Sequence, residues 1–231
     1  VLDRAEWTLE ANPENLSLEK SQFLRSMGFN RVSIGVQSFH NKYLKFLGRN
    51  HTSEQAQFAF QKARQAGFEN INVDLMFSFP HQTMDELNQD LKILIDLHAQ
   101  HVSLYGLTIE ENSKFYAQRM TLDEQEYLAK QYVQITEVLN GAGISQYEIS
   151  NFARPGFQSQ HNSNYWNGRE YIGLGVGAHS FLNHRRYWNV SRLQQYLERM
   201  ARKENPIDSF ELLTPETRLM ERILFGLRTN Q

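Results

Sequence analysis

Several polar side chains stand where predicted β-strands end, and their types suit recognition of a small polar molecule. Glu10, Gln37 and Asp74 each lie near the carboxyl end of a strand-like segment, on the side that is not apolar, and Arg49 follows the second of these segments. Carboxylates bind ribose hydroxyls or an ammonium group, an amide donates and accepts, and a guanidinium pairs with a carboxylate through a fork of donors. One such residue is most simply a structural hydrogen-bonding group. Four at related positions predict a shared ligand site.

A second group of candidate residues lies in the run HNSNYW at residues 161–166. This run sets the imidazole of His161 beside amides and the rings of Tyr165 and Trp166, in a segment that we predict to be a loop. Imidazole can ligate iron, and aromatic rings can hold a flat ring. Spacing alone favours an ordinary hydrogen-bonding role for His161, so the chemistry of this run stays open at this point.

Other kinds of site find no support in the sequence. It has no GxGxxG, P-loop, GxSxG or paired-histidine zinc motif, and its glycine-rich run at residues 173–177 does not precede a predicted helix. The net charge is −2, and the aromatic residues are not interleaved with a basic stripe. No apolar run approaches the roughly 18 residues of a membrane span, and no secretory signal is visible. We therefore expect a cytoplasmic protein that binds no nucleic acid and has no membrane span.

The elements that must position these residues alternate between strand and helix. Strands are predicted over residues 5–13, 31–39, 70–80 and 101–108, and a helix follows each of the first three. The first helix begins near Ser17, Ser53 is predicted to cap the second, and a capping box is predicted between Thr83 and Glu86 at the third. Such alternation predicts a parallel sheet covered by helices. The alternative, a half-exposed antiparallel sheet, is disfavoured because the helices between the strands leave no place for hairpins.

The two sides of each predicted strand differ in character. In the third strand, Val73 and Leu75 face one way, and Asn72 and Asp74 face the other. An ordinary doubly wound sheet would be apolar on both sides. A polar side on every strand instead predicts an α/β barrel, or part of one, around a polar cavity, and four strands are too few to close it.

The pattern changes after residue 108, and we predict a division into residues 1–145, the barrel portion, and residues 146–231, an accessory α+β region. The accessory region should contain a short strand at Tyr147–Phe152 and then the loop with HNSNYW. The run Tyr171–Phe181 is too rich in glycine for a helix and predicts a strand and turn whose backbone comes close to another group. Helices are predicted over residues 191–203 and 214–227.

Several of these segments resemble a known family. The runs GFNRVSIGVQSF, LGRNHT, INVDLMFSFP and VSLYGLTIE resemble the oxygen-independent coproporphyrinogen III oxidase superfamily of radical S-adenosylmethionine (SAM) proteins. HNSNYW followed by EYIGLGVGAHS resembles the HemW branch of that superfamily, the haem chaperones. The resemblance covers nearly all of the chain.

The resemblance implies a three-quarter TIM-like (β/α)6 barrel and a set of binding residues. Glu10, Gln37, Arg49 and Asp74 match the family's SAM-contacting positions, and Gly106 matches a backbone contact beside the adenosyl group. His161, Tyr165 and Trp166 would face haem or another porphyrin substrate. The partners implied are haem or a porphyrin and a protein that accepts haem.

The chain departs from the family in one respect. The family's CxxxCxxC loop, which holds a [4Fe–4S] cluster, comes before the strand that starts this chain, and the chain has no cysteine. We therefore expect a fragment that lacks the N-terminal strands, is inactive alone and binds SAM weakly or not at all. Three functions stay open for the whole protein: a haem chaperone, a coproporphyrinogen III oxidase, which is an oxidoreductase of porphyrin biosynthesis, and a cluster-free barrel that binds another small molecule.

Overall fold

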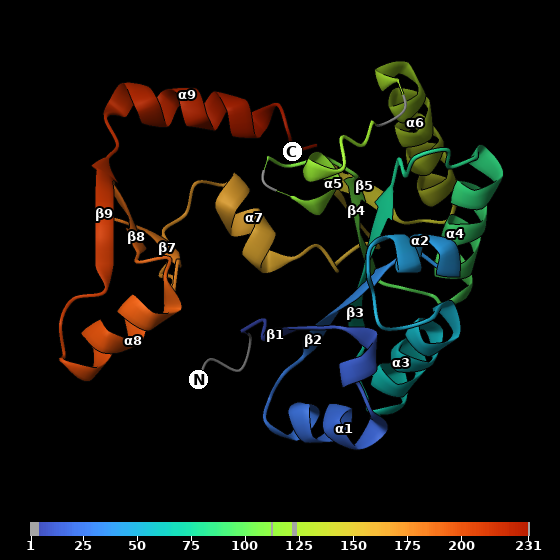
Figure 1. Ribbon diagram of the computed structural model, residues 1–231, viewed down its shortest axis with the longest axis horizontal. Helices are drawn as coiled ribbons and strands as arrows, with labels where there is room; N and C mark the ends of the chain where they lie inside the picture. Colours follow the sequence, from blue (N-terminus) through green and yellow to red (C-terminus); the bar gives the residue numbers. More distant parts are fainter. Residues whose placement is uncertain (1–4, 112, 122–123, 231) are drawn as a thin grey trace. The chain divides into compact units, whose positions relative to one another are not determined.

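A computed structural model describes residues 5–111, 113–121 and 124–230 of the chain (Figure 1). Two compact units divide between Gln158 and Ser159. This division lies later than the predicted one at residue 145, because the segment that follows residue 145 pairs with the sheet of the first unit.

The first unit is built on a six-stranded sheet with the order β1-β2-β3-β4-β6-β5. Its strands are β1 (Thr8–Ala11), β2 (Arg31–Gln37), β3 (Asn70–Phe77), β4 (His101–Gly106), β5 (Ser145–Glu148) and β6 (Asn151–Ala153). Strands β1 to β4 run parallel, whereas β6 is antiparallel to β4 and to β5. The parallel strands were predicted. The single strand predicted at Tyr147–Phe152 is wrong, because the chain reverses there and forms two short strands.

Helices follow the parallel strands as the sequence predicts. They are α1 (Leu18–Ser26), α2 (Asn41–Phe46), α3 (Ser53–Gln65), α4 (Met84–Asp96), α5 (Lys114–Ala117) and α6 (Gln125–Gly141), with a 3-10 turn at Pro13–Asn15. The capping box predicted between Thr83 and Glu86 is confirmed at the start of α4. At α3 the cap is Thr52, paired with Gln55, and the predicted cap at Ser53 is wrong by one residue.

The hydrophobic core lies on one side of this sheet. Val73 and Leu75 of β3 are buried there with Phe60 of α3, Leu91 of α4 and Ile135 of α6. Full burial of one such side chain contributes about 1.5–3 kcal/mol to the free energy of folding. The alternation along the strands therefore fixes which side the helices cover, and the polar side is left to face a cavity.

The second unit contains a three-stranded antiparallel sheet and three helices. Its elements are α7 (Gln160–Trp166), β7 (His179–Leu182), β8 (Arg185–Asn189), α8 (Leu193–Ala201), β9 (Ile207–Leu212) and α9 (Pro215–Gly226). HNSNYW lies in α7, so the prediction of a loop there is wrong. The side chain of Ser159 accepts the backbone N–H of Asn162 and starts this helix, although the run has no apolar periodicity.

The glycine-rich run ends in a close approach of two backbone segments, as predicted. Tyr171 and Phe181 exchange backbone hydrogen bonds of 2.9 Å in both directions. Between them, a Cβ added to Gly173 would lie 2.1 Å from the carbonyl oxygen of His179. Only glycine fits at this position. Among the described helices of both units, none is long and apolar enough to cross a membrane.

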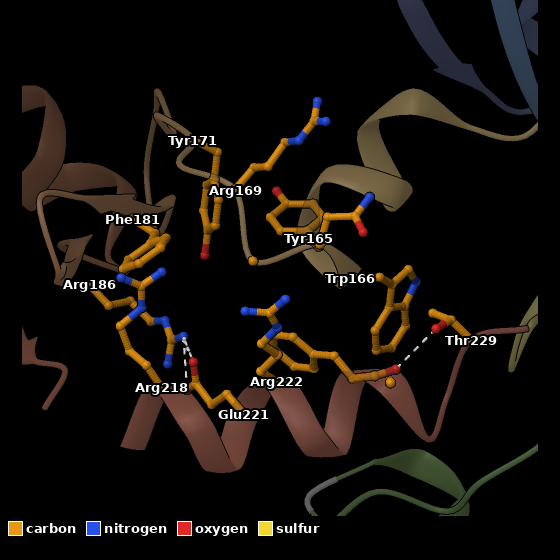
Figure 2. Close-up of a pocket in the computed structure, with 14 residues that line it drawn as sticks. Tyr165, Trp166, Arg169, Tyr171, Phe181, Arg186, Arg218, Glu221, Arg222 and Thr229 are labelled. Carbon is orange, nitrogen blue, oxygen red and sulfur yellow. Dashed lines mark hydrogen bonds and ion pairs between the residues drawn. The ribbon is translucent and has the colours of Figure 1, made fainter. Parts of the chain in front are cut away.

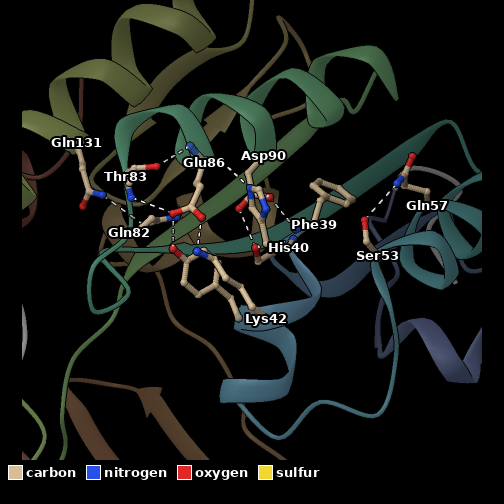
Figure 3. A network of polar contacts seen from close by, with 12 residues as sticks. Phe39, His40, Lys42, Ser53, Gln57, Gln82, Thr83, Glu86, Asp90 and Gln131 are labelled. Atoms are coloured by element: carbon tan, nitrogen blue, oxygen red, sulfur yellow. Dashed lines mark hydrogen bonds and ion pairs between the residues drawn. The ribbon is translucent and has the colours of Figure 1, made fainter.

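A buried carboxylate links α4 to the segment that follows β2 (Figure 3). Asp90 accepts hydrogen bonds from the Ser38 hydroxyl at 2.8 Å and from the Phe39 backbone N–H at 2.7 Å. Burial raises the pKa of the Asp90 carboxyl to about 6, even though these two donors act in the opposite direction. His40 adds an imidazole nitrogen 3.8 Å from the same carboxylate.

Asp90 should therefore make the protein less stable as pH rises. A carboxyl with a folded-state pKa of about 6, against about 4 when unfolded, favours folding most below pH ~4, and this advantage disappears by pH ~7. We expect Asp90→Asn to remove about 3 kcal/mol of pH dependence between these limits. Urea unfolding at several pH values measures it, with the exposed Asp96→Asn on the same helix as control. A difference between wild type and Asp90→Asn that is constant with pH would contradict this expectation.

Candidate functional site

Four of the five residues predicted to contact SAM line one cavity of the first unit. Its volume is about 610 Å³, and Glu10, Gln37, Arg49 and Asp74 are among its lining residues. Small-molecule sites commonly have volumes of roughly 300–1,000 Å³. Gly106 is not among the lining residues; a Cβ placed on it would contact Phe77 and Leu128 instead. The structure thus brings together the four side chains, but not the glycine.

The strands and their connections explain this convergence. Glu10 and Asp74 lie on the polar side of parallel strands, and β2 ends with Gln37 in the left-handed region at φ 72°. Arg49 follows α2 and Gly48, whose φ of 71° suits a residue without a side chain. Because parallel strands end at the same edge of a sheet, residues far apart in the sequence meet at one cavity.

A buried network beneath the cavity holds Asp74. Its carboxylate accepts from the Ser33 hydroxyl at 3.0 Å and from the Asn72 side-chain amide at 2.7 Å. Burial raises the pKa of Asp74, and these donors partly offset that effect. The Asn72 oxygen lies 2.6 Å from Nδ1 of His101, whose Nε2 lies 2.8 Å from the hydroxyl of Tyr147. The network therefore extends from the cavity to β5.

The donors and acceptors of this network can be assigned. Asn72 turns its amide nitrogen to the Asp74 carboxylate and its oxygen to His101. Burial holds the pKa of His101 well below its usual range, and Arg31 adds to the effect, so the imidazole is neutral. Nδ1 then donates to Asn72, and Nε2 accepts from Tyr147.

Three further lining residues were missed by the sequence analysis. Asn12 accepts a hydrogen bond of 3.0 Å from the Arg49 guanidinium, and Lys20 brings a second cation from α1. A Cβ on Gly35 would lie 3.2 Å from the Gln37 amide nitrogen, so the cavity wall is tight there. One signal in the sequence could have identified Asn12 as a binding residue. It directly follows the first strand, and ligands of parallel sheets bind at the carboxyl ends of the strands.

The chemistry of the lining suits a ligand that carries both signs of charge. Glu10 and Asp74 offer carboxylates, Arg49 and Lys20 offer cations, and Gln37 both donates and accepts. These side chains fit the ammonium, carboxylate and ribose hydroxyls of SAM. A [4Fe–4S] cluster does not fit this chain, which has no cysteine. Within the described residues, no group of three or more His, Cys, Asp or Glu side chains could hold a metal ion.

The residues of HNSNYW are placed beside a second cavity, within the second unit (Figure 2). Tyr165 and Trp166 line this cavity, which has a volume of about 440 Å³. His161 is not among its lining residues, but its ring meets the ring of Tyr165 edge-on at 4.7 Å between centroids. The end of α7 thus places the rings of Tyr165 and Trp166 at the cavity, whereas the imidazole of His161 contacts the Tyr165 ring and does not line the cavity.

Comparisons with known proteins identify the class of protein that this parallel sheet and its polar cavity resemble. Residues 2–94 match the family model described as the radical SAM superfamily. The fold matches a solved structure of coproporphyrinogen III oxidase (HemN) from Escherichia coli, a radical SAM enzyme. The TM-score is 0.84 and the identity is 24%, over 98% of this chain and 56% of that one. The predicted resemblance to the radical SAM superfamily and the predicted partial barrel are confirmed.

Within that superfamily, the chain is similar to proteins named heme chaperone HemW. It is 39% identical to HemW of Bacillus subtilis (strain 168), over 98% of this chain and 61% of that protein. It is 42% identical to HemW of Escherichia coli (strain K12), over 76% of this chain and 46% of that protein. The chain thus spans about three-fifths of the Bacillus subtilis relative. The predicted HemW resemblance is confirmed.

Proposed function

We propose that the whole protein is a haem chaperone that binds SAM and a [4Fe–4S] cluster. The observation that carries the proposal is the likeness, over 98% of this chain, to a protein named heme chaperone HemW. The polar cavity supports the SAM part, because four predicted binding residues line it together. We further propose that the protein works in the cytoplasm and passes haem to an acceptor protein.

The cavity residues would divide the work of holding SAM. Arg49, steadied by Asn12, would bind the carboxylate, while Glu10 and Asp74 would bind the ammonium group or ribose hydroxyls. Bound SAM supplies radical chemistry when an iron–sulfur cluster is present. The chain's own part is to orient SAM and exclude water. Thiolates for the cluster would come from outside these residues, so we still expect this chain to be inactive alone and to bind SAM weakly.

Two alternatives remain for the whole protein. The fold match to HemN keeps a coproporphyrinogen III oxidase as the runner-up, because both functions need the same barrel. The lack of cysteine in this chain keeps a cluster-free barrel that binds another small molecule as the third. The three differ in product and in ligand, and one experiment separates them.

The test uses the whole protein after anaerobic cluster reconstitution. We expect it to cleave SAM, to leave coproporphyrinogen III unconverted and to bind hemin. Chromatography of the tetrapyrroles and absorption titration with hemin provide the readings. Conversion to protoporphyrinogen IX would overturn the chaperone in favour of the oxidase. Failure to take up a cluster or cleave SAM would favour the third function.

A substitution of His161 tests the proposed haem binding at a single residue. We expect His161→Ala to weaken hemin binding by about tenfold, which corresponds to about 1.4 kcal/mol. His179→Ala, at an exposed histidine of the same unit that does not line the cavity, serves as the control. Equal hemin affinity in wild type and His161→Ala would remove His161 from the haem site without bearing on the rest of the proposal.

A further inference from the structure

The cavity beside HNSNYW has walls of two chemical kinds. The first kind is aromatic, and its members come from three elements and a loop: Tyr165, Trp166, Tyr171, Phe181 and Phe225. Their rings pack mostly edge to face, with centroids 4.6 Å apart for Tyr165 and Tyr171 and 5.7 Å apart for Trp166 and Phe225. Packed rings of this kind form a stiff apolar wall that suits a flat, aromatic ligand.

The second kind is cationic. Four guanidinium groups line the cavity, those of Arg169, Arg186, Arg218 and Arg222, against the single carboxylate of Glu221. That carboxylate is already used, because it binds Arg186 at 3.0 and 3.1 Å. The remaining guanidinium groups give the cavity an excess of positive charge, which favours an anionic ligand.

Two of these arginines keep donors available. Arg218 donates to Nδ1 of His184 at 2.8 Å and stands 5.7 Å from the centroid of the Phe181 ring, and a guanidinium has donors beyond these contacts. The guanidinium of Arg222 forms no hydrogen bond or ion pair with any described residue. The two lie four positions apart on α9 and so share one face of the helix, where like charges repel unless an anion joins them. In Figure 2 both extend from α9 toward the cavity that Tyr165 and Tyr171 line.

We propose that Arg218 and Arg222 bind the carboxylates of a tetrapyrrole whose ring edge lies against the aromatic wall. Haem carries two carboxylates on adjacent positions of one edge, and a guanidinium binds a carboxylate through two parallel hydrogen bonds. A cavity of about 440 Å³ takes that edge and leaves the remainder of the ring outside. This inference rests on the proposed function and adds to it the residues that bind the carboxylates of the ligand.

In this arrangement, α7 and α9 of the second unit have different roles. Trp166 and Tyr165 of α7 would hold the ring, and α9 would hold the carboxylates. A tetrapyrrole without free carboxylates would then keep the aromatic contacts and lose those with α9. The contribution of α9 can be measured by changing either the ligand or the arginines.

The test titrates three probes into this chain and follows quenching of tryptophan fluorescence: hemin, protoporphyrin IX and protoporphyrin IX dimethyl ester. We expect Arg218→Gln and Arg222→Gln each to weaken binding of the first two by about tenfold, since hydrogen bonds to charged groups are the stronger kind. The ester loses both carboxylate contacts, so it should bind wild type about a hundredfold more weakly and be insensitive to both variants. Arg202→Gln, at an exposed arginine after α8, is the matched control. ATP, a flat ring with a different anion, should not displace hemin.

The outcomes distinguish this inference from the proposed function. If hemin binds and neither arginine variant weakens it, or if the ester binds as tightly as the acid, the inference is wrong and the chaperone proposal stands. Displacement by ATP would make the cavity a nucleotide site and also overturn the inference. Absence of hemin binding by this chain overturns it as well, and hemin titration of the whole protein then decides the chaperone proposal separately. Circular dichroism of the variants verifies that each is folded.

Discussion

Replacing Asn72 with leucine is expected to destabilise the first unit by about 3–5 kcal/mol. Its amide nitrogen lies 2.7 Å from both Ser33 and Asp74, and its oxygen 2.6 Å from His101. Leucine has a similar size but no polar atoms, so it leaves a buried carboxylate short of a donor and a buried N–H without an acceptor. Each unsatisfied buried group costs about 1–3 kcal/mol. The loss should exceed the ~1 kcal/mol of a typical point substitution.

Urea unfolding followed by circular dichroism measures this loss. The control is Asn140→Leu at an exposed position of α6, where we expect a change within about 0.5 kcal/mol. Asn72→Leu also removes a donor that lowers the pKa of Asp74, so that pKa should rise further. A loss below about 1 kcal/mol would show that the polar side of the sheet tolerates an apolar residue at position 72. That result would contradict the importance of the buried hydrogen-bond network.

Replacing Gly173 with alanine should have the second large effect, on the other unit. The added methyl carbon would lie 2.1 Å from the carbonyl oxygen of His179 and 2.9 Å from its carbonyl carbon. Both atoms belong to the backbone, so no side chain can rotate away. The pair of hydrogen bonds between Tyr171 and Phe181 would have to separate, and Phe181 lines the cavity of this unit. We expect a loss of at least about 3 kcal/mol or failure of this unit to fold.

Limited proteolysis and fluorescence of Trp166 and Trp188 report on the second unit. The control is Gly141→Ala at the end of α6 in the first unit, where an added Cβ has open space and alanine favours the helix by about 0.5–1 kcal/mol. Hemin binding should be lost in Gly173→Ala and retained in Gly141→Ala. A Gly173→Ala protein as stable as wild type would mean that the two backbone segments can separate at little cost.

The sequence alone was enough to predict the barrel portion, because the patterns that specify its strands and helices each lie within one short segment of the chain. Alternation along β3 places Val73 toward the core and Asp74 away from it, and Thr83 with Glu86 starts α4. Strands followed by helices imply parallel pairing, and parallel strands end together. Hence Glu10 and Gln37 could be expected at one cavity without knowledge of any contact.

The rest depended on contacts between residues distant in the chain. The loop predicted for HNSNYW is a helix because Ser159 caps it, and a polar run has no periodicity that would reveal this. Gly106 matched a family position but lies outside the cavity that the side chains form.

Only the tertiary structure brings Tyr147 to His101, and the arginines of α9 to the aromatic wall. The sequence therefore determined the strands, their polar side and four cavity residues. The tertiary structure decided which buried polar groups satisfy one another and where the second cavity lies, because such pairings arise only when separate segments pack together.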